Sequence, residues 1–134
     1  MTQTTTLTPA IIESLYDEAL ALAEDARDAF EFSAGRESGA PEMGRIALSC
    51  EALRTTTRMM HALAWLLNHR AYFAGELSES QLRRHGRLPP PQPASDAAQM
   101  ALLAPEVAEL VARSVTLYDR LGWLDRAWQQ HLPQ

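Results

Sequence analysis

Three stretches of the chain repeat apolar residues at intervals of three and four, the spacing of one face of an α-helix. The first begins after Leu7-Thr8-Pro9, which combines a threonine N-cap, a proline at the first helical position and a staple between Leu7 and Ile12. The pattern predicts an amphipathic helix over residues 9–33, and Gly35 to Gly39 end the pattern. Its core positions are Ile12, Leu15, Ala19, Leu22, Ala26, Ala29 and Ser33.

A longer helix is predicted over residues 41–75, because Pro41 suits a first turn and Gly75 suits a helix end. A second apolar edge, which includes Leu48, Met59 and Phe73, lies beside its predicted core stripe. A helix that packs on one neighbour needs an apolar stripe only about 100° wide, so we expect this one to contact two neighbours or a second chain. The predicted core stripe is Ile46, Cys50, Leu53, Thr57, Met60, Ala64, Leu67, Ala71 and Ala74.

The rest of the chain predicts a short helical turn, an extended crossing and a third long helix. Ser78 to Gln81 have capping-box spacing, the prolines of residues 88–93 favour polyproline conformation, and residues 94–103 fit either a short helix or a strap. A 3-4 stripe over residues 105–130 predicts the third long helix, with core positions Val107, Leu110, Ser114, Leu117, Leu121, Leu124 and Trp128. The predicted fold is all-α, an up-down-up three-helix bundle forming one domain over residues 1–134, with residues 88–93 outside.

Composition and charge exclude several functions. The chain has no lysine, and its 12 basic residues face 17 acids for a net charge of -5, so general electrostatic binding to nucleic acid is not expected. Cys50 is the only cysteine, which rules out an internal disulfide and fits a reducing, cytoplasmic location. The first basic residue is Arg27, so no secretory signal is expected. The most apolar segment, residues 59–67, is far shorter than the roughly 20 residues that cross a bilayer.

Signatures of catalysis and cofactor binding are not found in the sequence. There is no glycine-rich phosphate loop, no G-x-S-x-G elbow and no H-E-x-x-H motif, and no glutamate stands three residues before a histidine as in helical di-iron sites. We therefore expect no enzyme activity, cofactor or metal, and Cys50 is expected to act as a small core hydrophobe. The basic cluster of Arg83 to Arg87 is better explained by a solvated turn than by a phosphate contact.

A second stripe on the long helix has the composition of a binding surface. It consists of Arg54, Arg58, His61, Trp65, Asn68 and Tyr72, turned away from the predicted core stripe. Arginine, tryptophan and tyrosine are enriched in interface hot spots, so Arg54, Arg58, Trp65 and Tyr72 are the candidate protein-binding residues. The alternative is that the arginines pair with acids of the first helix while Trp65 and Tyr72 cover the core.

The excess of apolar positions also predicts a symmetric homodimer. The long helix is apolar over more of its circumference than two neighbours would cover, and the third long helix adds apolar residues beside its core stripe. The candidate interface residues are Leu66, Phe73, Val111, Val115 and Tyr118.

Two segments resemble a known family. The run from Glu51 to Ala71, with Arg-Thr-Thr-Thr-Arg and Trp-Leu-Leu-Asn-His-Arg-Ala at its centre, is followed by Gly75-Glu76, and residues 114–121 precede Leu124-Asp125. These segments resemble the alphaproteobacterial family typified by RcdA, the regulator of CtrA degradation, over residues 10–128 in outline. The resemblance implies a three-helix bundle, usually dimeric. It also implies an adaptor that holds protein cargo and helps deliver it to the ClpXP protease, with a response-regulator-like partner, during cell-cycle progression.

The resemblance has one departure, at the C-terminus. The typified member carries a flexible extension implicated in delivery, whereas this sequence reaches Pro133-Gln134 directly after the third predicted long helix. We therefore expect cargo binding to be retained more surely than stimulation of proteolysis. A structural dimerisation module and a bundle that binds a small ligand in its core are the alternative functions.

Overall fold

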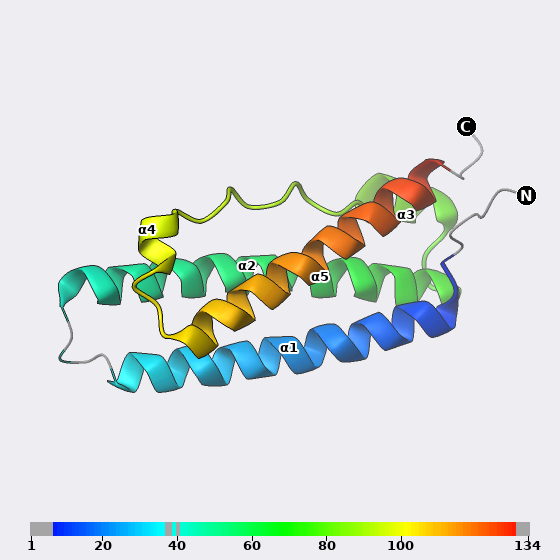
Figure 1. Ribbon diagram of the computed structural model, residues 1–134. Helices are drawn as coiled ribbons and strands as arrows, with labels where there is room; N and C mark the ends of the chain where they lie inside the picture. Colours follow the sequence, from blue (N-terminus) through cyan, green and yellow to red (C-terminus); the bar gives the residue numbers. More distant parts are fainter. Residues whose placement is uncertain (1–6, 37–38, 40, 131–134) are drawn as a thin grey trace, which may run out of the picture.

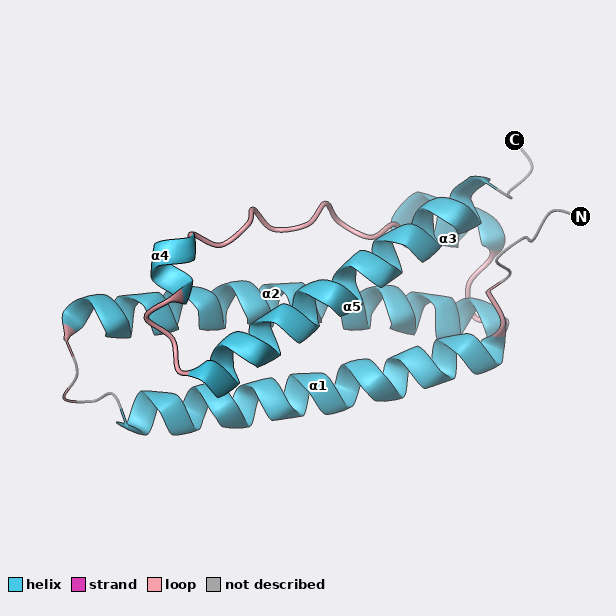
Figure 2. Ribbon diagram, in the orientation of Figure 1, coloured by secondary structure: helices cyan, strands magenta, loops and turns pink. Residues whose placement is uncertain are grey.

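The structure, a computed structural model, describes residues 7–36, 39 and 41–130 (Figure 1). It contains α1 (Pro9–Arg36), α2 (Glu42–Phe73), α3 (Glu79–His85), α4 (Ala97–Met100) and α5 (Pro105–Gln130). No strand occurs in these ranges, so the all-α prediction is confirmed (Figure 2). Pro133-Gln134 and part of the interruption after α1 lie outside the described residues.

Local capping signals place several helix ends where the sequence predicts them. The Thr8 side chain accepts a hydrogen bond from the Ile11 amide at 3.2 Å, which caps the start of α1. After α2, Gly75 has a φ of 81°, a left-handed conformation that favours glycine. The Ser78 capping box is complete, and α5 runs without a break through Gly122.

The three long helices pack on one another, but their directions differ from the predicted order. Polar contacts join Arg58 to Ser114 and Trp65 to Asp125, so α2 and α5 run in the same direction. Glu18 of α1 pairs with Arg120 of α5, and Arg36, at the end of α1, pairs with Glu106, at the start of α5. Helix α1 is therefore antiparallel to α5. The predicted up-down-up order is therefore wrong, because the third long helix runs parallel to the second.

An extended segment of residues 86–96, here called the strap, makes this order possible. At about 3.1 Å per residue it spans roughly 30 Å, which returns the chain along most of a long helix (Figure 1). Three hydrogen bonds hold it: Leu88 N to Asp125 Oδ2 at 3.3 Å, Tyr118 Oη to Pro89 O at 2.6 Å, and Ser95 Oγ to Glu51 Oε1 at 2.7 Å. The predicted extended crossing is confirmed, and α4 follows it.

The core includes the predicted stripes of α1 and α5 but not that of α2. The predicted positions on α1 and α5 are buried or half-buried. On α2 the large members of the predicted core stripe are exposed: Ile46 by 50%, Leu53 by 70%, Met60 by 64% and Leu67 by 47%. The buried side of α2 instead consists of Ala47, Leu48, Glu51, Thr55, Arg58, Met59, Ala62, Trp65, Leu66 and His69. The assignment of the core face of α2 is therefore wrong.

Candidate protein-binding surface

Two of the four candidate protein-binding residues lie inside the fold. Trp65 is 2% exposed, and its Nε1 donates a hydrogen bond to Asp125 Oδ1 at 3.0 Å. Arg58 is 5% exposed and donates to Ser114 Oγ at 2.9 Å. Burial lowers the pKa of the Arg58 guanidinium, against the opposing effect of the Glu51 carboxylate. The prediction that this stripe faces away from the core is therefore wrong at both positions.

The other two candidates, Arg54 and Tyr72, are half-buried. Arg54 forms an ion pair of 3.1 Å with the buried carboxylate of Glu51, and the Tyr72 ring packs edge-on against neighbouring aromatic rings. The alternative prediction was that Trp65 covers the core and that the arginines pair with acids of the first helix. It is right about Trp65 and wrong about the arginines. Arg54 pairs within α2, and Arg58 contacts α5 rather than α1.

The predicted dimer interface requires a similar correction. Leu66, Val111 and Tyr118 are 0%, 2% and 4% exposed within the single chain. A second copy cannot reach these three side chains without unpacking the core, so their assignment to an interface is wrong. Phe73 is half-buried, and Val115 is 38% exposed.

His69 is a further buried polar group of α2. Its ring lies 4.0 Å from that of Trp65 and 5.3 Å from that of Trp128, and neither ring nitrogen has a hydrogen-bond partner in the described part of the chain. Burial lowers its pKa to about 4, although the Asp125 carboxylate acts in the opposite direction. Within the described ranges no three potential ligands gather as a metal site would need. His69 is therefore a neutral aromatic side chain of the core at neutral pH.

The side of α2 that faces solvent carries a row of large apolar residues, which we call the α2 stripe. It consists of Met43, Ile46, Leu53, Met60 and Leu67, and from Ile46 onward its members are seven residues apart. Such spacing is typical of a helix that packs lengthwise against another helix. Together these residues expose apolar area on the order of 500 Å², a size that is often functional.

A hollow of about 290 Å³ lies between α1 and α2, beside the α2 stripe. Ala26 and Phe30 of α1 and Met59, Met60 and Leu63 of α2 are among its lining residues. Its lining is mostly apolar, so it suits the insertion of an apolar side chain. This hollow and the neighbouring part of the α2 stripe form an open apolar surface at the edge of α2 next to α1. The predicted residues face the α5 side instead.

Residues 3–134 match the family described as protein of unknown function (DUF1465). The chain belongs to this family. No curated protein and no solved structure matches it. In this DUF1465 chain, none of the described helices is long and apolar enough to cross a membrane.

The sequence of this DUF1465 protein contains one signal that could have identified the α2 stripe. Its large residues alternate with small ones, Cys50, Thr57, Ala64 and Ala71, at spacings of four and three. This pattern fits a seam between helices as well as it fits a core face. The two uses can be separated only when the structure shows which residues of α2 are buried against α1 and α5.

Proposed function

We propose that this protein is a noncatalytic, protein-binding adaptor of the kind that the resemblance to the RcdA family implies, holding cargo such as cell-cycle regulators for delivery to ClpXP. The observation that carries the proposal is the α2 stripe. Burying a large aliphatic side chain stabilises a protein by roughly 1.5–3 kcal/mol, and the chain leaves this contribution unused along one face of α2. A row of exposed large apolar side chains along one helix favours a protein partner.

The shape of the stripe supports a protein rather than a small molecule as the ligand. Residues 43–67 extend about 36 Å along the helix axis, longer than a small ligand would cover. The carboxylates of the core form hydrogen bonds and ion pairs that hold the fold together. Glu51 binds Arg54 and the strap, and Asp125 binds Trp65 and the strap. This use of the core carboxylates favours binding over catalysis.

A structural dimerisation module is the second candidate function, and the same stripe favours it. A symmetric homodimer would place the α2 stripes of two copies together, in place of the buried residues Leu66, Val111 and Tyr118. Light scattering across a range of concentrations measures this directly. A dimer that the double substitution Leu53→Lys/Met60→Lys dissociates would support the module, and a monomer at all concentrations would exclude it.

The adaptor proposal is tested by reconstituted degradation with the matching ClpXP, a response-regulator-like partner and candidate cell-cycle cargo. We expect the protein to bind cargo and to shorten its half-life, and the Leu53→Lys/Met60→Lys variant to lose both effects. Trp123→Lys is the matched control, because Trp123 is 54% exposed on α5, on another helix. The proposal fails if the α2 variant acts like the unsubstituted chain, or if no cargo is bound.

A further inference from the structure

We propose that the groove between α1 and α2 binds a basic amphipathic helix from a partner protein. This inference rests on the proposed function and specifies the chemistry of the partner. The groove has an apolar bank, an apolar floor and an acidic bank. Each of these three parts constrains what can occupy it.

The apolar bank is the α2 stripe. Leu53, Met60 and Leu67 are each about half exposed or more, and their spacing of seven residues repeats about every 10 Å along the helix. A partner helix that presents apolar residues at i, i+3, i+4 and i+7 matches this repeat. The bank therefore selects a helix over an extended peptide, whose side chains on one face repeat about every 7 Å.

The floor is the hollow of about 290 Å³ beside Met60. Thr55 contributes to its lining and is 2% exposed, and its hydroxyl has no hydrogen-bond partner among the described residues. A buried hydroxyl without a partner is costly, so the site is incomplete in the free chain. An apolar side chain of a bound helix would fill the hollow.

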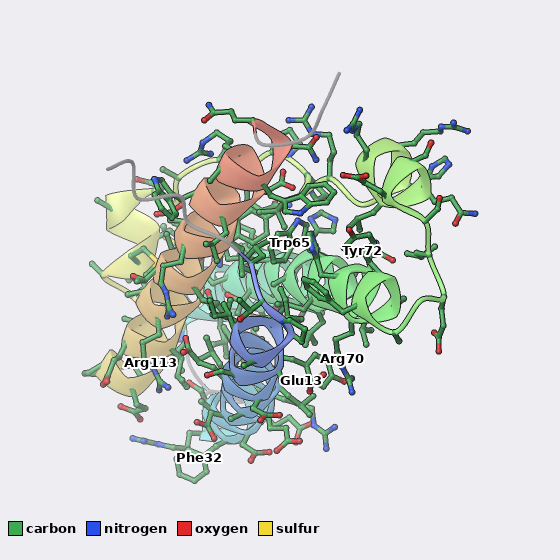
Figure 3. All side chains as sticks on the ribbon, turned by 90° about the vertical axis from the view of Figure 1, so that its right-hand side faces the viewer. Glu13, Phe32, Trp65, Arg70, Tyr72 and Arg113 are labelled. Carbon is green, nitrogen blue, oxygen red and sulfur yellow. The ribbon has the colours of Figure 1, made fainter. Side chains whose placement is uncertain are left out.

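The acidic bank runs along α1. Asp17, Glu24 and Glu31 are exposed at intervals of seven residues, and Glu31 itself lines the hollow. Arg27 also lines the hollow and forms a weak, exposed ion pair of 3.7 Å with Glu31, whereas within the described residues Asp17 and Glu24 form no ion pair. Farther along, Glu13 is already paired with Arg70 across the two helices (Figure 3). These acids, two of them unpaired and Glu31 only weakly paired, favour a partner with lysine or arginine along one edge of its apolar face.

The same charges distinguish this partner from a second copy of the chain. A second copy would bring another α1 with the same acids, on a chain whose net charge is also -5. Like charges placed opposite each other weaken an interface. A basic helix instead gains attraction at the acidic bank in addition to apolar burial on the stripe.

Titration of the full chain with two designed helical peptides tests the proposal. Both carry leucine at i, i+3, i+4 and i+7; one has lysine along one flank, and the other has glutamate there. Fluorescence anisotropy should give at least about tenfold tighter binding of the lysine peptide at low salt, with the difference shrinking as salt screens the charges. Equal affinity for the two peptides would overturn the proposal, as would no binding of either.

Protein variants locate the site. Glu24→Lys/Glu31→Lys should weaken binding of the lysine peptide at least about tenfold, and Met60→Lys should weaken binding of both peptides. Glu109→Lys is the matched control, because Glu109 is an exposed acid of α5. Circular dichroism melting verifies that each variant folds. Unchanged affinity in the Glu24→Lys/Glu31→Lys variant would overturn the proposal.

Two outcomes separate this inference from the proposed function. In the first outcome, Met60→Lys abolishes cargo degradation while the lysine peptide binds no better than the glutamate peptide. That result would support the adaptor function and show that the inference of a basic partner helix is wrong. If the chain forms a dimer that Met60→Lys dissociates and the peptides cannot displace, the groove belongs to a second copy and the inference is wrong.

Discussion

Single residues of α2 contribute more to the stability of the fold than their polarity indicates, and Trp65 is the clearest case. Replacing it by alanine removes a buried ring and leaves the Asp125 carboxylate without one of its donors. We expect Trp65→Ala to lower the free energy of unfolding by about 3–5 kcal/mol in urea titrations. Leu67→Ala, at a position 47% exposed on the same helix, should cost less than about 1 kcal/mol. Equal costs would contradict the assignment of Trp65 to the core.

His69 makes the stability of the protein dependent on pH. Its pKa of about 4 in the folded chain lies below the ordinary value of 6.5, so the unfolded chain binds more protons between these values. Stability is therefore lost as the pH falls from about 6.5 toward 4. Between pH 7.5 and pH 5 we expect a loss of about 2 kcal/mol in the free energy of unfolding. His69→Phe should remove this part of the dependence, and an unchanged dependence in that variant would show that other groups cause it.

The sequence-based prediction of the core face of α2 was wrong, and the reason lies in individual residues. The buried face of α2 includes Glu51, Thr55, Arg58 and His69, while the exposed face includes Leu53 and Met60. An apolar stripe is the usual sign of a core face, so the pattern alone favoured the wrong side. The polar groups can be buried because Glu51, Arg58 and Asp125 have partners on α2, α5 and the strap. Such long-range pairing cannot be inferred from helical spacing.

At the scale of elements, the strap depends on a small number of hydrogen bonds. Burial raises the pKa of the Tyr118 hydroxyl, so it remains protonated and donates to Pro89 O. Tyr118→Phe should lower the free energy of unfolding by about 1 kcal/mol and speed hydrogen exchange of the Leu88 amide, which is bonded next to this contact. Tyr72→Phe is the control, since no hydrogen bond joins Tyr72 to the strap in the part of the chain that the structure describes. Unchanged exchange at Leu88 would mean that the strap is held by other contacts.

Helix positions were predictable because the signals that set them are local. The Thr8 cap, the left-handed Gly75 and the Ser78 capping box each act within a few residues, and all three lie where predicted. The end of α1 was less predictable, since the helix continues through Gly35 to Arg36. Glycine weakens a helix by only about 1 kcal/mol, which neighbouring contacts can offset.

At the scale of the whole molecule, the order of the helices could not be read from their stripes, because each stripe fits either direction. The strap decides it, since about 30 Å of extended chain carries the polypeptide back before α5 begins. Spin labels in a Cys50→Ser background can test this order. A label at Arg45 should lie nearer to one at Glu109 than to one at Arg126, by roughly 20 Å at 1.5 Å per helical residue. An up-down-up bundle would reverse the two distances, and in that case the contacts from α2 to Ser114 and Asp125 could not both form.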